Sequence, residues 1–177
     1  MTFDAFEQMK AKGSLEFGQL PVLRQSDGTM MAQSGAILRA LGIKYGYYPS
    51  DAMERWQVDS TIDAINDIFD FVAKCLFGGT DQSKKASLAD LLQYRLPKFL
   101  KAMNKRLDGK RYMTGREITI ADFALGGFFL QTVANEHSPH YEQFLTELQK
   151  HEHCIEFIRH FRDDNLPYIE SMTPSFF

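Results

Sequence analysis

Residues 119–133 read Thr-Ile-Ala-Asp-Phe-Ala-Leu-Gly-Gly-Phe-Phe-Leu-Gln-Thr-Val, and this stretch decides the fold. Thr119 followed three residues later by Asp122 has the spacing of a capping box, with Asp in the place where Glu is usual. The body from Phe123 to Val133 is almost wholly apolar, and a helix that is apolar on every side is buried. We therefore predict a central helix whose start is anchored by Thr119 and Asp122, which we interpret as folding residues.

Two long amphipathic segments precede the predicted core helix. Residues 51–76 and 83–107 both carry apolar residues at helical spacings. Pro97 lies inside the second segment, and we expect it to kink the helix or to leave one backbone hydrogen bond unmade. Shorter amphipathic pieces follow over residues 141–161. The sequence thus predicts an all-helical C-terminal domain over residues 51–177.

The first 43 residues have a different pattern, in which strand and turn signals lie between two short helical segments. The pattern predicts a short helix, the two strands of a hairpin and a second helix, over residues 2–12, 20–24, 29–32 and 34–41. Ser34 suits the N-cap of the second helix, and Gly42 suits its stop. The expected fold class is α+β, with a small α/β unit over residues 1–43 followed by the all-α domain.

The composition is that of an ordinary globular protein. The chain has 177 residues, of which 44% are hydrophobic and 24% are charged, and its net charge is −3. Proteins that bind nucleic acid concentrate Lys and Arg to displace counterions from phosphates, so we expect no nucleic-acid partner. No apolar run approaches the ~20 residues of a membrane span, and no basic-then-apolar leader opens the chain. We expect a cytoplasmic protein with no membrane partner.

The cysteines and histidines show no metal-binding pattern. Neither Cys75 nor Cys154 belongs to a CxxC arrangement, so a free thiol in a reducing compartment is expected for each. His151 and His153 are two residues apart, and a helix would point them to opposite sides. We predict no metal ligand among these residues.

Asp59, Asp63 and Asp67 recur at every fourth residue of the first long helical segment. Like charges at this spacing oppose a helix by a few tenths of a kcal/mol per pair. A solvated acidic face is the simplest interpretation. A metal site is the rival one, but no histidine lies nearby, and carboxylates alone at this spacing are unspecific.

Four blocks of sequence together resemble one protein family. They are Phe17-Gly18-Gln19-Leu20-Pro21-Val22-Leu23, the stretch 33–39, Tyr45-Gly46-Tyr47-Tyr48-Pro49 and the stretch 115–123. In this order they are similar to the cytosolic glutathione transferases, and the pattern is closest to the tyrosine-type classes such as sigma and pi. The resemblance runs from about residue 6 to residue 165. It implies that residues 1–43 are part of a thioredoxin-like, glutathione-binding domain.

The resemblance also shows one departure. The family begins with a strand, a helix and a second strand, and a tyrosine near the end of the first strand activates the thiol. None of the seven tyrosines of this chain sits in the matching position, so the expected catalytic tyrosine lies upstream of Met1 and no catalytic residue is assigned. Without that segment, we expect the hairpin to be a two-stranded remnant.

For the γ-glutamyl end of glutathione, the resemblance implies three side chains. Ser34 and Gln33 would bind the carboxylate at a helix start, where unpaired N–H groups and the helix dipole attract anions. Asp63 would reach the γ-glutamyl ammonium across a dimer interface.

Further residues are implied along the rest of the ligand. A cis bond before Pro21 would turn the Leu20 main chain outward to pair with the extended tripeptide. Lys12 falls where the family holds the glycine carboxylate, and Gln19 would lie beside the same end. Phe6 falls near a position that is often tryptophan, so its match is imperfect.

The implied function is conjugation of reduced glutathione to hydrophobic electrophiles through a stabilised thiolate. Glutathione would be a co-substrate with no further cofactor, and the protein would be a homodimer. Two alternatives stay open: a non-catalytic structural or assembly subunit, and a glutathione-dependent isomerase that resembles the prostaglandin synthases.

Overall fold

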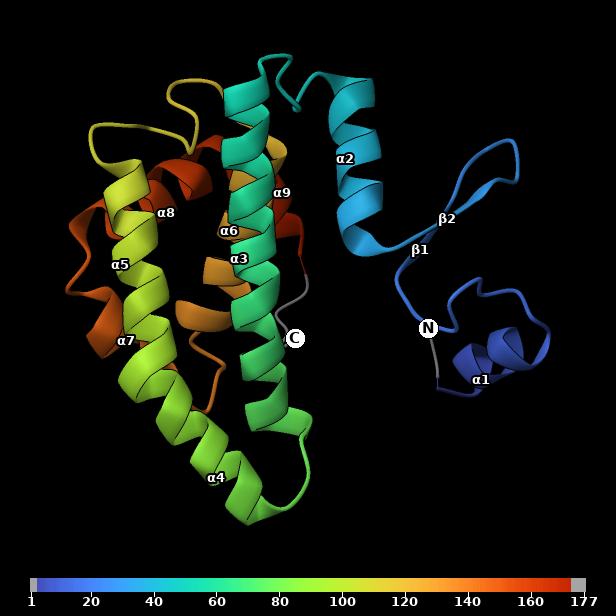
Figure 1. The fold of residues 1–177 in the computed structure, drawn as a ribbon, viewed down its shortest axis with the longest axis horizontal. Coiled ribbons are helices and arrows are strands. Elements are labelled where there is room, and N and C mark those ends of the chain that lie inside the picture. The colour runs from blue at the N-terminus through green and yellow to red at the C-terminus, as the bar shows by residue number, and fades with distance from the viewer. Residues whose placement is uncertain (1–2, 173–177) are drawn as a thin grey trace. The chain divides into compact units, whose positions relative to one another are not determined.

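A computed structural model describes residues 3–172, which fall into two compact units divided between Tyr48 and Pro49. The first unit contains α1 (Phe3–Ala11), β1 (Val22–Arg24), β2 (Met30–Ala32) and α2 (Ser34–Tyr45). The second contains α3 (Ala52–Phe77), α4 (Asp81–Asp90), η1 (Leu91–Arg95), α5 (Leu96–Leu107), α6 (Ile120–Phe128), η2 (Phe129–Val133), α7 (Tyr141–Leu148), α8 (Glu152–Asp164) and α9 (Leu166–Ser171). The predicted α+β class is confirmed (Figure 1).

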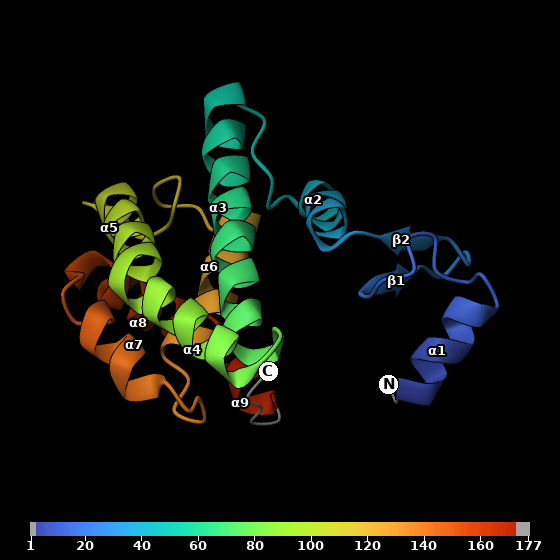
Figure 2. The same cartoon turned by 60° about the horizontal axis from the view of Figure 1, so that its bottom comes forward.

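The first unit is built around an antiparallel hairpin. Val22 pairs with Ala32 and Arg24 with Met30, and in the described residues this sheet has two strands, as expected. The turn between the strands is closed by the Thr29 N–H, which donates to Asp27 Oδ1 at 2.8 Å. Hydrogen bonds from Thr29 lower the pKa of the Asp27 carboxyl. Figure 2 shows α2 following directly from β2.

The boundaries of α2 differ from the prediction at both ends. Gln33 is the N-cap and Ser34 is the first helical residue, so the prediction that Ser34 caps the helix is wrong. The prediction that Gly42 stops the helix is also wrong, because α2 continues through this buried glycine. The left-handed conformation that ends the helix is at Gly46, with φ of 82°, and the Gly46 N–H donates to the Gly42 carbonyl.

The second unit is an all-helical bundle in which α3 is the longest element. Asp51 caps α3 by accepting hydrogen bonds from the N–H groups of Met53 at 2.8 Å and Glu54 at 3.0 Å. Figures 1 and 2 both show α6 running beside α3. The core includes the fully buried rings of Phe129 and Phe157, which meet edge to face at 6.1 Å between centroids. Every helix within residues 3–172 is too short or too polar to span a lipid bilayer.

Two π-helical turns interrupt segments that the sequence presents as single helices. The segment expected over residues 83–107 consists of α4 and α5 joined end to end by η1, in which the Leu96 N–H donates to the Leu91 carbonyl. Pro97 then lies in the first turn of α5, directly after the π turn, where its missing N–H removes one hydrogen bond to a preceding carbonyl. Likewise α6 ends at Phe128 and gives way to η2. The expected effect of Pro97 therefore takes the form of a π turn just before it.

The start of α6 depends on the buried carboxylate of Asp122, whose side chain is 0% exposed. It accepts hydrogen bonds from the Thr119 N–H and hydroxyl, both at 2.8 Å, and from the Met113 N–H at 2.7 Å. The predicted capping box is present at Thr119 and Asp122, and the same carboxylate also binds the preceding loop. Burial raises the pKa of Asp122, and these hydrogen bonds oppose that rise.

Replacement of Asp122 by Asn should destabilise the helical unit by about 1–3 kcal/mol. An amide has one acceptor oxygen, and its NH₂ group would face donors that the carboxylate now satisfies. Urea unfolding followed by circular dichroism measures the effect. Asp163→Asn, an exposed position on α8, is the matched control. Equal unfolding midpoints for the two variants would contradict this role of Asp122.

Cys154 is expected to be unreactive in the folded protein. Its side chain is 0% exposed, its thiol lies 3.7 Å from the Leu100 carbonyl, and burial raises its pKa to about 12. Because the folded pKa is raised, the stabilisation from the neutral thiol is complete below the unfolded value of about 8.5 and is lost as pH rises towards 12. Native iodoacetamide labelling at pH 8, read by mass spectrometry, should therefore occur only as fast as the protein unfolds. Labelling of Cys154 at the rate of a free thiol would contradict this.

Candidate functional site

A cavity of about 140 Å³ lies at the end of the hairpin in the first unit. It is lined by Phe17, Gln19, Leu20, Pro21, Ala32, Gln33 and Ser34. The lining thus includes four of the six predicted glutathione-binding residues, namely Gln19, Leu20, Gln33 and Ser34. Pro21 lines the same cavity. The cavity is mostly polar and open on the surface of this unit, since Leu20 and Phe17 are 43% and 56% exposed.

The hairpin register brings these residues together. Val22, at the start of β1, pairs with Ala32, at the end of β2. The residues just before Val22 and just after Ala32 must therefore lie side by side. These residues are Leu20 and Pro21 before β1 and Gln33 and Ser34 after β2. The Leu20–Pro21 peptide bond is cis, as the resemblance implies.

Gln33 has an unusual backbone conformation, with φ of 69° and ψ of 107°. A positive φ is unfavourable for a residue with a side chain, and such strain concentrates at ligand sites. Gln33 nevertheless begins α2, because its carbonyl accepts the Ile37 N–H at 2.9 Å. Within residues 3–172, its side chain makes no capping hydrogen bond to α2. The first N–H groups of an α-helix have no acceptor within the helix, and the start of α2, where the helix dipole is positive, lies in the cavity wall at Gln33 and Ser34.

The other two predicted binding residues lie elsewhere. Lys12 follows directly after α1 and is exposed, and it is not among the described residues that line the cavity. Asp63 is exposed on α3 and belongs to the second unit. Phe6 is covered by the Lys10 ammonium, 5.2 Å from the ring centroid. The structure therefore brings together the hairpin-end residues, and the roles of Lys12 and Asp63 stay predictions.

Metal-ligating side chains do not cluster in the described part of the chain, where no group of three could hold an ion. His151 Nε2 lies 3.6 Å from Glu147 Oε1, and His153 Nε2 lies 3.4 Å from Asp108 Oδ1. His153 Nδ1 also lies 3.6 Å from Glu156 Oε2, so His151 faces one carboxylate and His153 faces two.

Comparison with known proteins assigns the family. The family described as Glutathione S-transferase, C-terminal domain, matches residues 66–170, which is more than half of the chain. Glutathione S-transferase 2 of Caenorhabditis elegans is 32% identical over 154 residues, covering 80% of this chain and 81% of that protein.

The chain belongs to the glutathione S-transferase family.

Other glutathione S-transferases match over a smaller share of their length. Glutathione S-transferase 2 of Onchocerca volvulus is 31% identical over 122 residues, which cover 69% of this chain but 57% of that protein. The structure of prostaglandin synthase D of Nilaparvata lugens matches with a TM-score of 0.80 at 22% identity, covering 98% of this chain and 83% of that one. At 22% identity, the similarity to the Nilaparvata lugens structure shows the fold alone.

Sequence reasoning missed two features of this glutathione S-transferase site. Ala32 and Phe17 form part of the cavity wall, and their place is visible only once the hairpin register is known. The positive φ of Gln33 leaves no signal in the sequence, because residue type alone favours glycine there.

Gln33→Gly should relieve backbone strain and stabilise the first unit by about 1 kcal/mol. Slower hydrogen exchange of the α2 amides is the expected observation. Gln8→Gly, in the middle of α1, is the matched control and should accelerate exchange of α1, because glycine weakens a helix interior. Faster exchange of α2 in Gln33→Gly would show that the side chain, and not the strain, dominates at this position.

Proposed function

We propose that this glutathione S-transferase family member binds reduced glutathione in the hairpin-end cavity and directs its thiolate onto hydrophobic electrophiles. The observation that carries the proposal is the meeting of Gln19, Leu20, Gln33 and Ser34 around one polar cavity. Membership of the family supports glutathione as the ligand.

The chemistry of the cavity matches the γ-glutamyl end of the tripeptide. Its carboxylate would lie at the start of α2, where it accepts hydrogen bonds from the Ser34 hydroxyl and from free N–H groups. Gln33 would donate its side-chain amide to the same group. The main chain of the exposed residue Leu20 would pair with the ligand backbone, so that the ligand adds a strand. This pairing does not depend on which group is bonded to the ligand sulfur.

Catalysis requires a thiolate. The free thiol has a pKa near 8.5, so only a few per cent is ionised at neutral pH, and each unit by which the pKa is lowered corresponds to about 1.4 kcal/mol of preferential thiolate binding. The thiol proton passes to solvent, and the thiolate sulfur then forms a bond to the electrophilic carbon; with an aryl halide the carbon–halogen bond breaks and halide leaves. The residues around the cavity supply binding and orientation, and a hydroxyl donor for the sulfur is assigned to none of them.

The dimer and the remaining ligand contacts belong to the same proposal. Asp63 of one subunit would pair with the γ-glutamyl ammonium of glutathione bound to the other, and Lys12 would pair with the glycine carboxylate. The exposed position of Asp63 on α3 is compatible with such a role.

Ser34→Ala and Asp63→Asn should each weaken glutathione binding about 10- to 150-fold, the equivalent of roughly 1.5–3 kcal/mol for a charge-assisted hydrogen bond. Isothermal titration calorimetry measures the change. Ser14→Ala and Asp67→Asn are matched controls, one exposed in the first unit and one a turn further along α3, and both should bind like the wild type.

Equal affinity in all four variants would contradict the site. Failure of the folded wild-type chain to bind glutathione at millimolar concentration would contradict the function as a whole. Turnover of an aryl halide tests the catalytic half of the proposal, and binding without turnover would favour the non-catalytic subunit.

A further inference from the structure

A short stretch of α4 has the charge pattern of a phosphorylation site. Lys84 and Lys85 lie three and two residues before Ser87, and Leu88 follows it directly. Protein kinases select substrates by charge pattern, and a kinase with an acidic substrate groove favours basic residues at these two positions. Ser87 is the one serine or threonine of the 177-residue sequence that has a basic residue at both of them.

The helix that carries this stretch is held to the helical unit by little buried surface. Of the ten residues of α4, all of which the structure describes, none is buried, and Ser87 and Leu88 are half-buried. Isolated helices shorter than about 12–15 residues are marginal in water, so a helix of this length depends on packing. Because α4 gains little from packing, it should open locally at a lower free energy than the core of the bundle.

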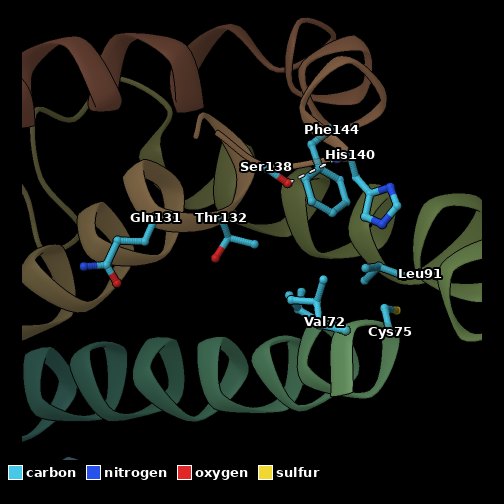
Figure 3. A pocket seen from close by; sticks show the side chains of 9 residues that line it. Val72, Cys75, Leu91, Gln131, Thr132, Ser138, His140 and Phe144 are labelled. Atoms are coloured by element: carbon cyan, nitrogen blue, oxygen red, sulfur yellow. Dashed lines mark hydrogen bonds between the residues drawn. The ribbon is translucent and has the colours of Figure 1, made fainter. Parts of the chain in front are cut away.

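The chain on either side of α4 confines the opening to this helix. Before it, Gly78 caps the end of α3, and its N–H stays bonded to that helix. After it, Leu91 of η1 is fully buried and lines a small cavity together with Val72 and Cys75 of α3 (Figure 3). Both ends are therefore fixed, and residues 81–90 can unwind between them.

A kinase needs this opening for two reasons. It must place the serine hydroxyl in line with the γ-phosphoryl group of its nucleotide, which requires close access to the backbone around Ser87. Moreover, residues two apart on a helix do not face the same way, so the closed α4 cannot present both Lys85 and Ser87 to one groove. An unwound segment removes both obstacles.

We propose that Ser87 is a phosphorylation site for a protein kinase with an acidic substrate groove, which acts on the locally opened α4. Ser87 Oγ forms a bond to the γ-phosphorus of ATP, and the bond between this phosphorus and the β,γ-bridging oxygen breaks. ADP leaves, and the hydroxyl proton passes to the catalytic carboxylate of the kinase. This inference is independent of the proposed function.

The phosphate would change the charge at the junction of α4 and η1. It adds about −1.5 to −2 charges three residues before Asp90, whose carboxylate pairs with the Arg95 guanidinium. The central carbon of this guanidinium lies 3.4 Å from the centroid of the Phe71 ring on α3. A phosphate on Ser87 would therefore repel Asp90 and compete with it for the cation that joins η1 to α3.

The site is tested by incubating the folded full chain with ATP, Mg²⁺ and the catalytic subunit of cyclic-AMP-dependent protein kinase, and by locating phosphate with mass spectrometry. The wild type should carry phosphate on Ser87, and Ser87→Ala should carry none. Ser83→Ala is the matched control on the same helix and should still be phosphorylated at Ser87, because no basic residue stands two or three positions before Ser83. Lys85→Gln should lower kcat/KM at least about tenfold through the loss of a charge-assisted contact to the kinase.

Ala89→Gly tests the opening of α4, since Ala89 is exposed and lies outside the charge pattern. Glycine weakens a helix interior, so the initial rate of phosphorylation of the folded chain should rise about fivefold. In an unfolded synthetic peptide of residues 81–92, the same change should leave the rate as it is. A folded chain without phosphate on Ser87, phosphate on another residue in its place, or equal rates for folded Ala89→Gly and wild type would each overturn the proposal.

Discussion

The carboxylate of Asp122 connects the first turn of α6 to the loop that precedes this helix. Its three hydrogen bonds join the first turn of α6 to the loop at Met113, which comes directly before it. Because α6 lies against α3, the helix with the longest buried face, a shift at the start of α6 would be transmitted into the centre of the bundle.

A second polar contact also fixes helices to one another. The Arg106 guanidinium donates to Ser60 at 3.0 Å and to Thr61 at 2.8 Å, and so fixes α5 to α3. Satisfied polar networks of this kind specify one arrangement of an otherwise interchangeable apolar core.

These anchors were predictable where the signal is local. The capping box at Thr119 and Asp122 and the start of α3 depend on side chains that bond to backbone groups two or three residues away, so the spacing alone indicates them. The end of α2 was mispredicted because two glycines, Gly42 and Gly46, suit a helix stop, and only the hydrogen bonds made around them decide which one takes the left-handed conformation. The π turns were beyond prediction because no residue type favours them. They arise from how a helix with Pro97 and a helix of uniform apolar character must fit their neighbours.

The candidate site follows the same division. The meeting of Leu20 with Ser34 is a consequence of hairpin register, and register follows from the turn at Asp27 and the strand pattern. The conformation of Gln33 follows from no local rule. Lys12 and Asp63 were predicted to bind glutathione from the family resemblance alone. Neither has a neighbour in the sequence that would distinguish a ligand-binding charged side chain from a solvated one.

The two units differ in what keeps them folded, and this difference bears on binding. Among the described side chains of the first unit, Leu15 is the one buried hydrophobic residue, whereas the second unit contains a continuous core of aromatic and aliphatic side chains. A two-stranded sheet with so little buried area gains little stability from its own contacts.

A ligand that binds only the ordered form adds RT ln(1 + [L]/Kd) to stability, about 2.7 kcal/mol at a concentration one hundred times Kd. On the proposed function, glutathione would therefore act as part of the core that the first unit lacks. The strained Gln33 can be tolerated at the cavity because the ligand that it helps to bind contributes to the stability of the segment around it.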